Sequence, residues 1–434
     1  NPPVGTLDAY GGSLTVEADL AEALHLTSIS AYREYDGDFG QSSLAVPVQE
    51  VRNGLSHRQF SQELRLLGSV LDGVVDYTFG GYYLDTRTLN PARVQTEGFI
   101  PSALDFYSDD TATLKSWAGF GAVDVRPIER LTLSARLRYS NETKTYTFRR
   151  DYSPSNLSVL NFVATGENQD DRLNPRFSIA YEVTDDVNAY ASYATGFTAS
   201  AFNARPFGAT GIFALQPEDV TAYELGFKSN LFDRMLRLNA AAFLTKFDNI
   251  VGTLRDPTYR NGACAVFCNE NVGNAEIKGF EVEALARPVA ELMISANVGY
   301  TDFEYKELLA TTQGLTLNSP QTRVPKWNLS GAVQYDVPLA PDQTITPRVD
   351  VSNRSDIYFS NDIRAVSSVQ PGYTLVNFRL TYRNDDLGFS LAGAVTNLFD
   401  EYFYTTLTDQ RESFGFFTGV VGRPREWAVT LRKE

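Results

Sequence analysis

The stretch from Leu215 to Glu283 decides the fold. It opens with LQPEDVTAYELGFKSN (Leu215–Asn230), and the tight turn LFDR (Leu231–Arg234) leads into MLRLNAAAFL (Met235–Leu244). Apolar and polar residues alternate along both arms, which predicts two strands that each have one apolar and one polar face. The turn is short, so the two strands form an antiparallel hairpin.

A long polar loop follows this hairpin before the next strand begins. It runs from Asp248 to Ala275 and ends in a third strand of the same pattern, Glu276 to Arg287. One short connection and then one long connection is the unit that the rest of the chain repeats. Short turns and long loops that alternate without a break are typical of a transmembrane β-barrel, with periplasmic turns on one rim and extracellular loops on the other.

The pattern predicts about seventeen strands over the chain of 434 residues. We expect the first at Gly12–Asp19 and the last at Trp427–Lys433, with Leu114–Val125, Leu173–Val183 and Thr344–Phe359 among those between. Many of them reach ten residues or more, which fits a tilted membrane crossing. A soluble sandwich or propeller has no reason to place every long loop on one side.

Composition agrees with this fold class and narrows the function. No apolar run approaches the ~20 residues that a membrane helix needs, whereas barrel strands carry their apolar residues at every second position. The net charge of −15 argues against a nucleic-acid partner, because phosphate contacts need clustered Lys and Arg. Tyrosines gather near the predicted strand ends, as rings at the level of lipid headgroups would. The residues expected to face lipid are Leu131, Leu133, Leu137, Leu236, Leu238, Phe280, Val282, Leu292, Ile294 and Val298.

The two cysteines, Cys264 and Cys268, lie inside this long polar loop. Three intervening residues allow a small disulfide ring, which would indicate an oxidising compartment. The alternative is a metal pair, but no His or further Cys lies nearby to complete a tetrahedral site. We therefore predict a Cys264–Cys268 disulfide in an outward loop.

Several stretches resemble the barrel of TonB-dependent outer-membrane receptors. They occur in the order found in that family and cover the chain from about Gly12 onward: LQPE with YELGFKS (Leu215–Ser229), NAEIKGFEVE (Asn274–Glu283), RVPKW (Arg323–Trp327), VTNLFDEY (Val395–Tyr402) and GRPREW (Gly422–Trp427). Gly226 and Gly279 lie inside strands of these motifs, where a missing side chain permits close approach or a bend.

The resemblance implies an outer-membrane transporter that takes up a scarce solute, most simply a ferric siderophore or similar iron complex. Its partners would be outer-membrane lipid, a small-molecule ligand such as an iron chelate, and the TonB energy-coupling complex. We expect a monomer that is no enzyme and holds no cofactor or metal of its own. A passive diffusion porin and a soluble surface-exposed β-repeat adhesin are the alternatives.

Family members carry an N-terminal plug domain that this sequence does not show. Residues 1–434 are therefore expected to be a partial barrel, about seventeen strands of about 22. Strand direction gives a second reason: the first and last strands would both run toward the periplasmic rim. Strands that pair in an antiparallel barrel must run in opposite directions, so we expect at least one further strand before Asn1.

Other candidate sites are weaker. His25 and His57 are predicted to be surface histidines, and the pairs Asp109-Asp110 and Asp170-Asp171 to be solvated charge in long loops, because no calcium-loop spacing surrounds them. Two long loops on the outer rim combine aromatic rings with arginines, which suits flat, anionic or catecholate-like ligands. Packing between loops is the alternative use of the same rings. The candidate contact residues are Phe197, Phe202, Arg205 and Phe207 in one loop, and Arg411, Phe414, Phe416 and Phe417 in the other.

Overall fold

The structure is a computed structural model that describes residues 5–42, 49–96, 105–153, 161–204, 206, 211–254, 268–309, 314–361, 368–411 and 416–433. Every element in this part of the chain is a strand: β1(Gly5–Ala21), β2(Leu24–Ser42), β3(Gln49–Val70), β4(Val75–Thr96), β5(Asp105–Ile128), β6(Leu131–Ser153), β7(Phe162–Thr184), β8(Val187–Thr198), β9(Glu218–Leu231), β10(Leu236–Leu254), β11(Cys268–Val289), β12(Leu292–Leu308), β13(Trp327–Tyr335), β14(Val337–Ala340), β15(Gln343–Arg354), β16(Ile357–Tyr358), β17(Val369–Gln370), β18(Tyr373–Asn384), β19(Phe389–Thr396), β20(Tyr404–Gln410), β21(Phe416–Val421) and β22(Glu426–Lys433). In these residues no helix is long and apolar enough to cross a membrane.

Eighteen of the strands belong to one antiparallel sheet, and β16–β17 and β20–β21 are separate hairpins. Because β13 and β14 pair with the same strand, β15, they count as one interrupted strand. The sheet therefore has seventeen strands that could each cross the membrane once, as the sequence predicts. The chain divides into two compact units, and each is described by itself.

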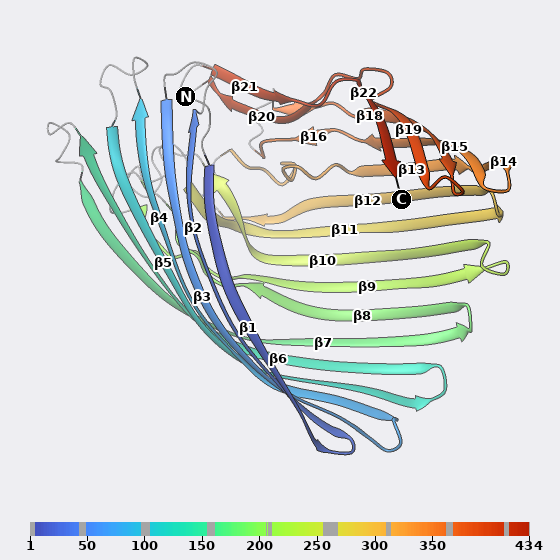
Figure 1. The fold of residues 1–434 in the computed structure, drawn as a ribbon. Coiled ribbons are helices and arrows are strands. Elements are labelled where there is room, and N and C mark those ends of the chain that lie inside the picture. Colours follow the sequence, from blue (N-terminus) through green and yellow to red (C-terminus); the bar gives the residue numbers. More distant parts are fainter. Residues whose placement is uncertain are drawn as a thin grey trace. The chain divides into compact units, whose positions relative to one another are not determined.

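The first unit comprises Asn1–Phe177, Ala194–Val220 and Asp248–Val272. Its strands β1 to β6 pair in chain order and lie side by side in Figure 1. The strands are longer than the apolar alternation predicted. β5 begins at Asp105 rather than Leu114, and β7 at Phe162 rather than Leu173. Part of each predicted long loop is therefore a continuation of the ladder.

The second unit comprises Ser178–Tyr193, Thr221–Phe247 and Gly273–Glu434. Its sheet runs from β11 through β12, β13, β15, β18 and β19 to β22. The predicted strand Thr344–Phe359 is shorter than expected, because β15 ends at Arg354 and residues 357–358 pair with β17 instead.

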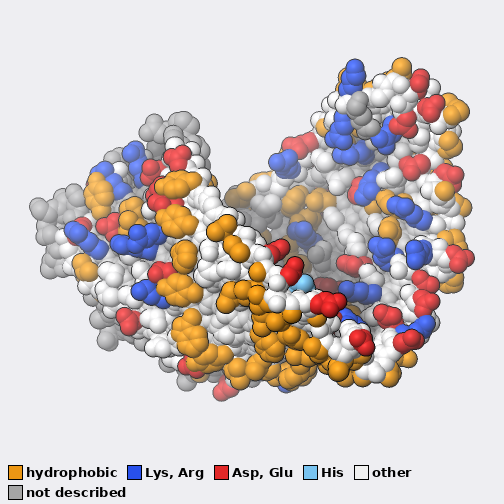
Figure 2. Space-filling model, turned by 60° about the horizontal axis from the view of Figure 1, so that its bottom comes forward, with side chains coloured by type: hydrophobic (Ala, Val, Ile, Leu, Met, Phe, Trp, Pro, Cys, Tyr) orange, Lys and Arg blue, Asp and Glu red, His pale blue; other side chains and the backbone are white. Residues whose placement is uncertain are grey.

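The register of the second unit confirms the predicted shared face. Phe280 lies opposite Tyr300 and Val282 opposite Val298, while Ala286 lies opposite Ile294. Partners that lie opposite each other project from the same side of a sheet. The first unit follows the same rule, since Leu133 and Leu137 are both exposed on one side of β6. Figure 2 shows hydrophobic side chains gathered in a band on the surface seen there.

Aromatic rings mark the end of this apolar face on β11 to β13. The ring of Tyr300 stacks on Phe280 at 5.6 Å between centroids and contacts Trp327 at 4.7 Å. From Leu292 to Tyr300 is about nine residues, close to the ~9–11 residues of a transmembrane strand.

Charged residues begin on the same face directly beyond these rings. The Lys278 ammonium lies 3.2 Å from Glu304 and 3.6 Å from Asp302, and Lys326 lies 2.8 Å from Asp302. The change from rings to ion pairs is the boundary that an aromatic girdle forms in an outer-membrane barrel.

Two strand-interior glycines permit close approach, the first of the two roles that the sequence left open. A Cβ on Gly226 would lie 2.7 Å from the carbonyl oxygen of Ala240 and 2.8 Å from the Tyr190 hydroxyl. A Cβ on Gly279 would lie 2.1 Å from the carbonyl oxygen of Tyr300. Neither site has room for a side chain.

The first and last strands are edges of the part of the sheet that the structure describes. β1 is paired with β2 and β22 with β19. Every residue of β1 and of β22 is exposed.

Candidate functional site

A polar network in the first unit holds the segment after β8 against β7. Leu173 and Phe177 of β7 are exposed on one face, so the alternation places Asn168 and Asp170 on the opposite, polar face. In an outer-membrane barrel the polar face lines the lumen.

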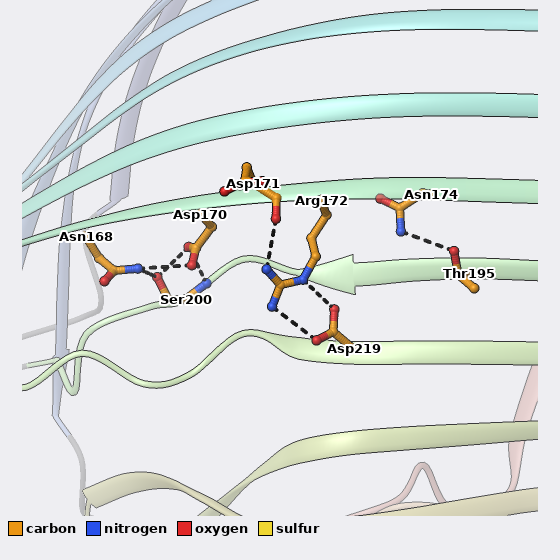
Figure 3. Close-up of polar contacts among 8 residues, drawn as sticks. All are labelled: Asn168, Asp170, Asp171, Arg172, Asn174, Thr195, Ser200 and Asp219. Atoms are coloured by element: carbon orange, nitrogen blue, oxygen red, sulfur yellow. Dashed lines mark hydrogen bonds and ion pairs between the residues drawn. The ribbon is translucent and has the colours of Figure 1, made fainter.

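Asp170 is the centre of this network (Figure 3). Its carboxylate accepts hydrogen bonds from the backbone N–H of Ser200 at 2.9 Å, from the Ser200 hydroxyl at 2.5 Å and from the Asn168 amide at 3.1 Å. Asp170 is 6% exposed and Ser200 2%. A carboxylate is buried at acceptable cost only when donors replace its water, and three donors do so here.

A second polar pair joins β7 to the start of β9. The Arg172 guanidinium donates to both carboxylate oxygens of Asp219, at 2.8 and 3.1 Å, and also to the carbonyl oxygen of Asp171 (Figure 3). Two parallel N–H···O bonds fix the orientation of both groups. The segment between β8 and β9 is thus fixed to β7 near both of its ends.

Aromatic stacking and two backbone contacts complete this attachment. The ring of Phe202 stacks on Tyr146 of β6 at 6.0 Å with planes 14° apart, and Lys144 donates to the carbonyl oxygen of Ala199 at 3.3 Å. An isolated bridge joins Phe202 to Ala214. Residues 199–204 and 214–215 therefore pack on the face of β6 and β7 that is opposite the exposed leucines.

Asn271 of β11 fixes the far end of the same segment. Its side chain accepts from the backbone N–H of Gln216 at 2.7 Å, and it donates to the carbonyl oxygens of Gln216 at 3.1 Å and Asn249 at 2.7 Å. Asn271 is buried. Nothing in the local sequence distinguishes this asparagine from a loop residue, so the sequence did not reveal it.

The predicted contact residues of the first loop take packing roles in the described structure. Phe197 lies under the Arg172 guanidinium at 5.9 Å, and Phe202 is held in the stack on Tyr146. Arg205 and Phe207 lie outside the described residues. The contacts of Phe202 are those of the packing alternative, and a ligand role for this loop stays a prediction.

The second loop forms a small group of its own in the second unit. Arg411 pairs with Asp409 at 2.6 Å, and its guanidinium lies 5.9 Å from the centroid of Phe417. Phe414 lies outside the described residues, and so does the side chain of Phe416, whose backbone begins β21.

The two aspartate pairs correct the sequence interpretation in part. They were expected as solvated loop charge, but they lie in β5 and β7, where Asp110 and Asp170 are buried and only Asp109 and Asp171 are exposed as expected. Asp110 accepts from the Tyr146 hydroxyl at 3.3 Å. The strands continue past the apolar band, so the carboxylates of Asp110 and Asp170 project onto a covered polar face instead of into water.

The remaining candidates are placed as follows. His25 pairs with Asp19 at 2.6 Å and is exposed, as expected for a surface histidine. His57 is only half-buried, and it stacks on Tyr35 at 4.8 Å. Cys268 begins β11 and is buried, whereas Cys264 lies outside the described residues. No group of three metal-ligating side chains occurs in the residues that the structure describes.

Comparison with known proteins identifies the class to which this architecture belongs. The sequence model of the family described as "TonB dependent receptor-like, beta-barrel" matches residues 2–398. The chain belongs to this family, whose barrels lie in the bacterial outer membrane.

Curated relatives and solved structures agree with the family. The ferric-pyoverdine M114 receptor PbuA of Pseudomonas sp. (strain M114) is 28% identical over 273 residues, which is 63% of this chain and 31% of the relative. The ferrioxamine B receptor of Salmonella typhimurium is 25% identical over 325 residues, covering 72% and 39% respectively. The ferric yersiniabactin uptake receptor FyuA from Yersinia pestis has the same fold, with a TM-score of 0.81 and 19% identity over 99% of this chain and 62% of that one. The match thus spans about a third of the length of the curated relatives.

Proposed function

We propose that this chain is the barrel of an outer-membrane receptor that takes up a metal chelate, most simply a ferric siderophore, with energy supplied through TonB. The family match over residues 2–398 carries the proposal. The names of the relatives support the ligand class, since they are receptors for ferric pyoverdine and ferrioxamine B. A receptor of this kind binds and moves its ligand, so we propose no enzymatic activity.

We further propose that the barrel is completed by strands and a plug encoded outside these 434 residues. The support is the state of the two edge strands, β1 and β22, which are exposed at every position. An unpaired strand edge in hydrocarbon leaves ladder groups unsatisfied, at several kcal/mol each. Additional strands would satisfy them, and a plug would keep a barrel of about 22 strands from leaking. The partners are then outer-membrane lipid and the TonB complex, and the receptor acts as a monomer.

Uptake of iron by cells tests this function. A strain that lacks its own siderophore receptors would express the full-length protein and receive radioactive iron as ferric pyoverdine, ferrioxamine B or ferric yersiniabactin. We expect accumulation of at least one chelate that stops when TonB is deleted or the proton gradient is dissipated. Deletion of TonB also distinguishes this receptor function from that of a passive porin, because a porin would admit small solutes whether or not TonB is present.

A further inference from the structure

A pocket at the long-loop end of β15 and β18 has chemistry unlike the surface around it. The cavity, of about 300 Å³, lies entirely in the second unit and is lined by Arg323, Ser352, Arg354, Ile357, Phe359, Tyr373, Leu375, Phe403, Tyr404 and Thr405. None of these residues is an Asp or Glu, in a chain whose net charge is −15. Two guanidinium groups therefore give this pocket a local positive charge.

The two arginines have no carboxylate partner in the described structure, unlike several other arginines of the chain. Arg172, Arg348 and Arg411 are each paired with an aspartate at 2.6 to 2.8 Å. No ion pair or side-chain hydrogen bond is made by Arg323 or Arg354 within the described residues, and both are exposed. The Arg323 guanidinium lies 5.8 Å from the centroid of the Phe359 ring.

The inner wall of the pocket is aromatic and already ordered. The rings of Tyr373 and Phe403 stack at 4.5 Å with planes 16° apart, and both are 8% exposed. Ile357 packs into the same cluster. The backbone N–H of Tyr404 donates to the Gln370 side chain at 2.8 Å, which fixes the start of β20 over the cluster. A ligand would not need to order these groups on binding.

The pocket opens on the polar face of the sheet. Val349 and Val351 of β15 are exposed on the apolar side, so Ser352 and Arg354 alternate to the other side. Arg354 lies opposite Tyr373, and Ser352 lies opposite Leu375, which places these four lining residues on one face. In an outer-membrane barrel the polar face lines the lumen and the long loops are extracellular, so a ligand that enters from outside would reach this pocket.

We infer that this pocket is a subsite for an anionic aryl group carried by the transported chelate. The inference rests on the proposed function and narrows its ligand class. Unpaired guanidinium groups bind carboxylate or phenolate oxygens by charge-assisted hydrogen bonds, and the ordered rings offer flat faces for stacking. A volume of about 300 Å³ is at the lower limit for small-molecule sites. It suits one ring of a chelate rather than the whole complex.

Binding to the intact protein in detergent tests the subsite with three ferric complexes. The complex of 2,3-dihydroxybenzoate is anionic and aromatic, that of citrate is anionic without rings, and that of acetohydroxamate has neither charge nor rings. Arg323→Gln and Arg354→Gln should weaken binding of the two anionic complexes by about tenfold or more. Phe359→Leu keeps an apolar wall but removes the ring, so it should weaken binding of the dihydroxybenzoate complex only.

Arg379→Gln is the matched control. Arg379 is an exposed arginine of β18 that does not line the pocket. It lies six residues along the strand from Tyr373, a distance of about 20 Å. This variant removes the same charge and should leave all three affinities unchanged.

The outcomes separate the subsite from the receptor function. Equal binding of the dihydroxybenzoate complex by the unaltered protein and by both arginine variants, Arg323→Gln and Arg354→Gln, would overturn the subsite, as would equal weakening by Arg379→Gln. Failure to bind that complex would also overturn it, while TonB-dependent uptake of another chelate would leave the proposed function standing. Absence of any TonB-dependent uptake would overturn both.

Discussion

The carboxylate of Asp170 receives two hydrogen bonds from Ser200, one from its backbone N–H at 2.9 Å and one from its hydroxyl at 2.5 Å. Thirty residues separate the two in sequence, and both are buried. This contact joins the interior of β7 to the segment that follows β8, so a polar side chain sets the path of the connection.

Replacement of Asp170 by Ala should release that segment. A methyl group cannot accept from Ser200, and a buried donor without an acceptor costs about 1–3 kcal/mol. We expect faster hydrogen exchange at residues 199–203, measured by mass spectrometry. Asp171→Ala is the control, because Asp171 is exposed and Arg172 contacts its backbone oxygen, which this substitution keeps. Unchanged exchange in Asp170→Ala would show that the stack of Phe202 on Tyr146 is sufficient to hold the segment.

Ala296→Arg tests the apolar face of β12. Ala296 lies opposite Ala284, midway between the short turn and the Tyr300 girdle. A charge at the bilayer midplane should lower the free energy of unfolding by about 2–4 kcal/mol. Urea unfolding in phospholipid vesicles measures this. Asn297→Arg, one residue further along β12 and on the polar face, should lower the free energy of unfolding much less. Equal losses in the two variants would contradict the assigned faces.

Gly226→Ala should destabilise the hairpin of β9 and β10. The added Cβ would lie 2.7 Å from the carbonyl oxygen of Ala240, and overpacking of this kind costs about 1–3 kcal/mol. The control is Gly393→Ala in β19, where no atom lies within 4 Å of the added carbon. Similar unfolding midpoints for the two variants would contradict this prediction, because β9 and β10 would then accommodate the added methyl group without loss of stability.

The Cys264–Cys268 disulfide is expected in protein isolated from intact outer membranes. A peptide that contains both cysteines should be two hydrogen masses lighter before reduction than after it. The ring is small, so its removal by Cys264→Ser should leave the unfolding midpoint nearly unchanged. Two alkylated thiols in unreduced protein would refute the pairing.

The sequence predicts the crossings well because a lipid-facing strand must alternate, as Leu133 and Leu137 do. It does not predict how far the strands continue beyond the membrane. From Thr165 to Arg172, β7 has no hydrophobic side chain, so the apolar alternation is missing from the sequence although the strand continues.

The site is hidden from the sequence for a related reason. The contacts of Asp170 with Ser200 and of Asn271 with Gln216 bring together residues far apart in the chain. Arg323 and Arg354 were not singled out either, because what distinguishes them is that they line one pocket together with Tyr373 and Phe403. That property is visible only when neighbours in space are known.

The length of the β5–β6 ladder limits which parts of the barrel can move. The two strands are paired from Ile128 and Leu131 at the turn to Asp105 and Ser153 at the far end. Opening this hairpin would break many backbone hydrogen bonds together, at about 1 kcal/mol net for each. The β16–β17 hairpin has only two residue pairs beside the arginine pocket. Separation of the two strands would therefore cost far less free energy in the short hairpin than in the long one.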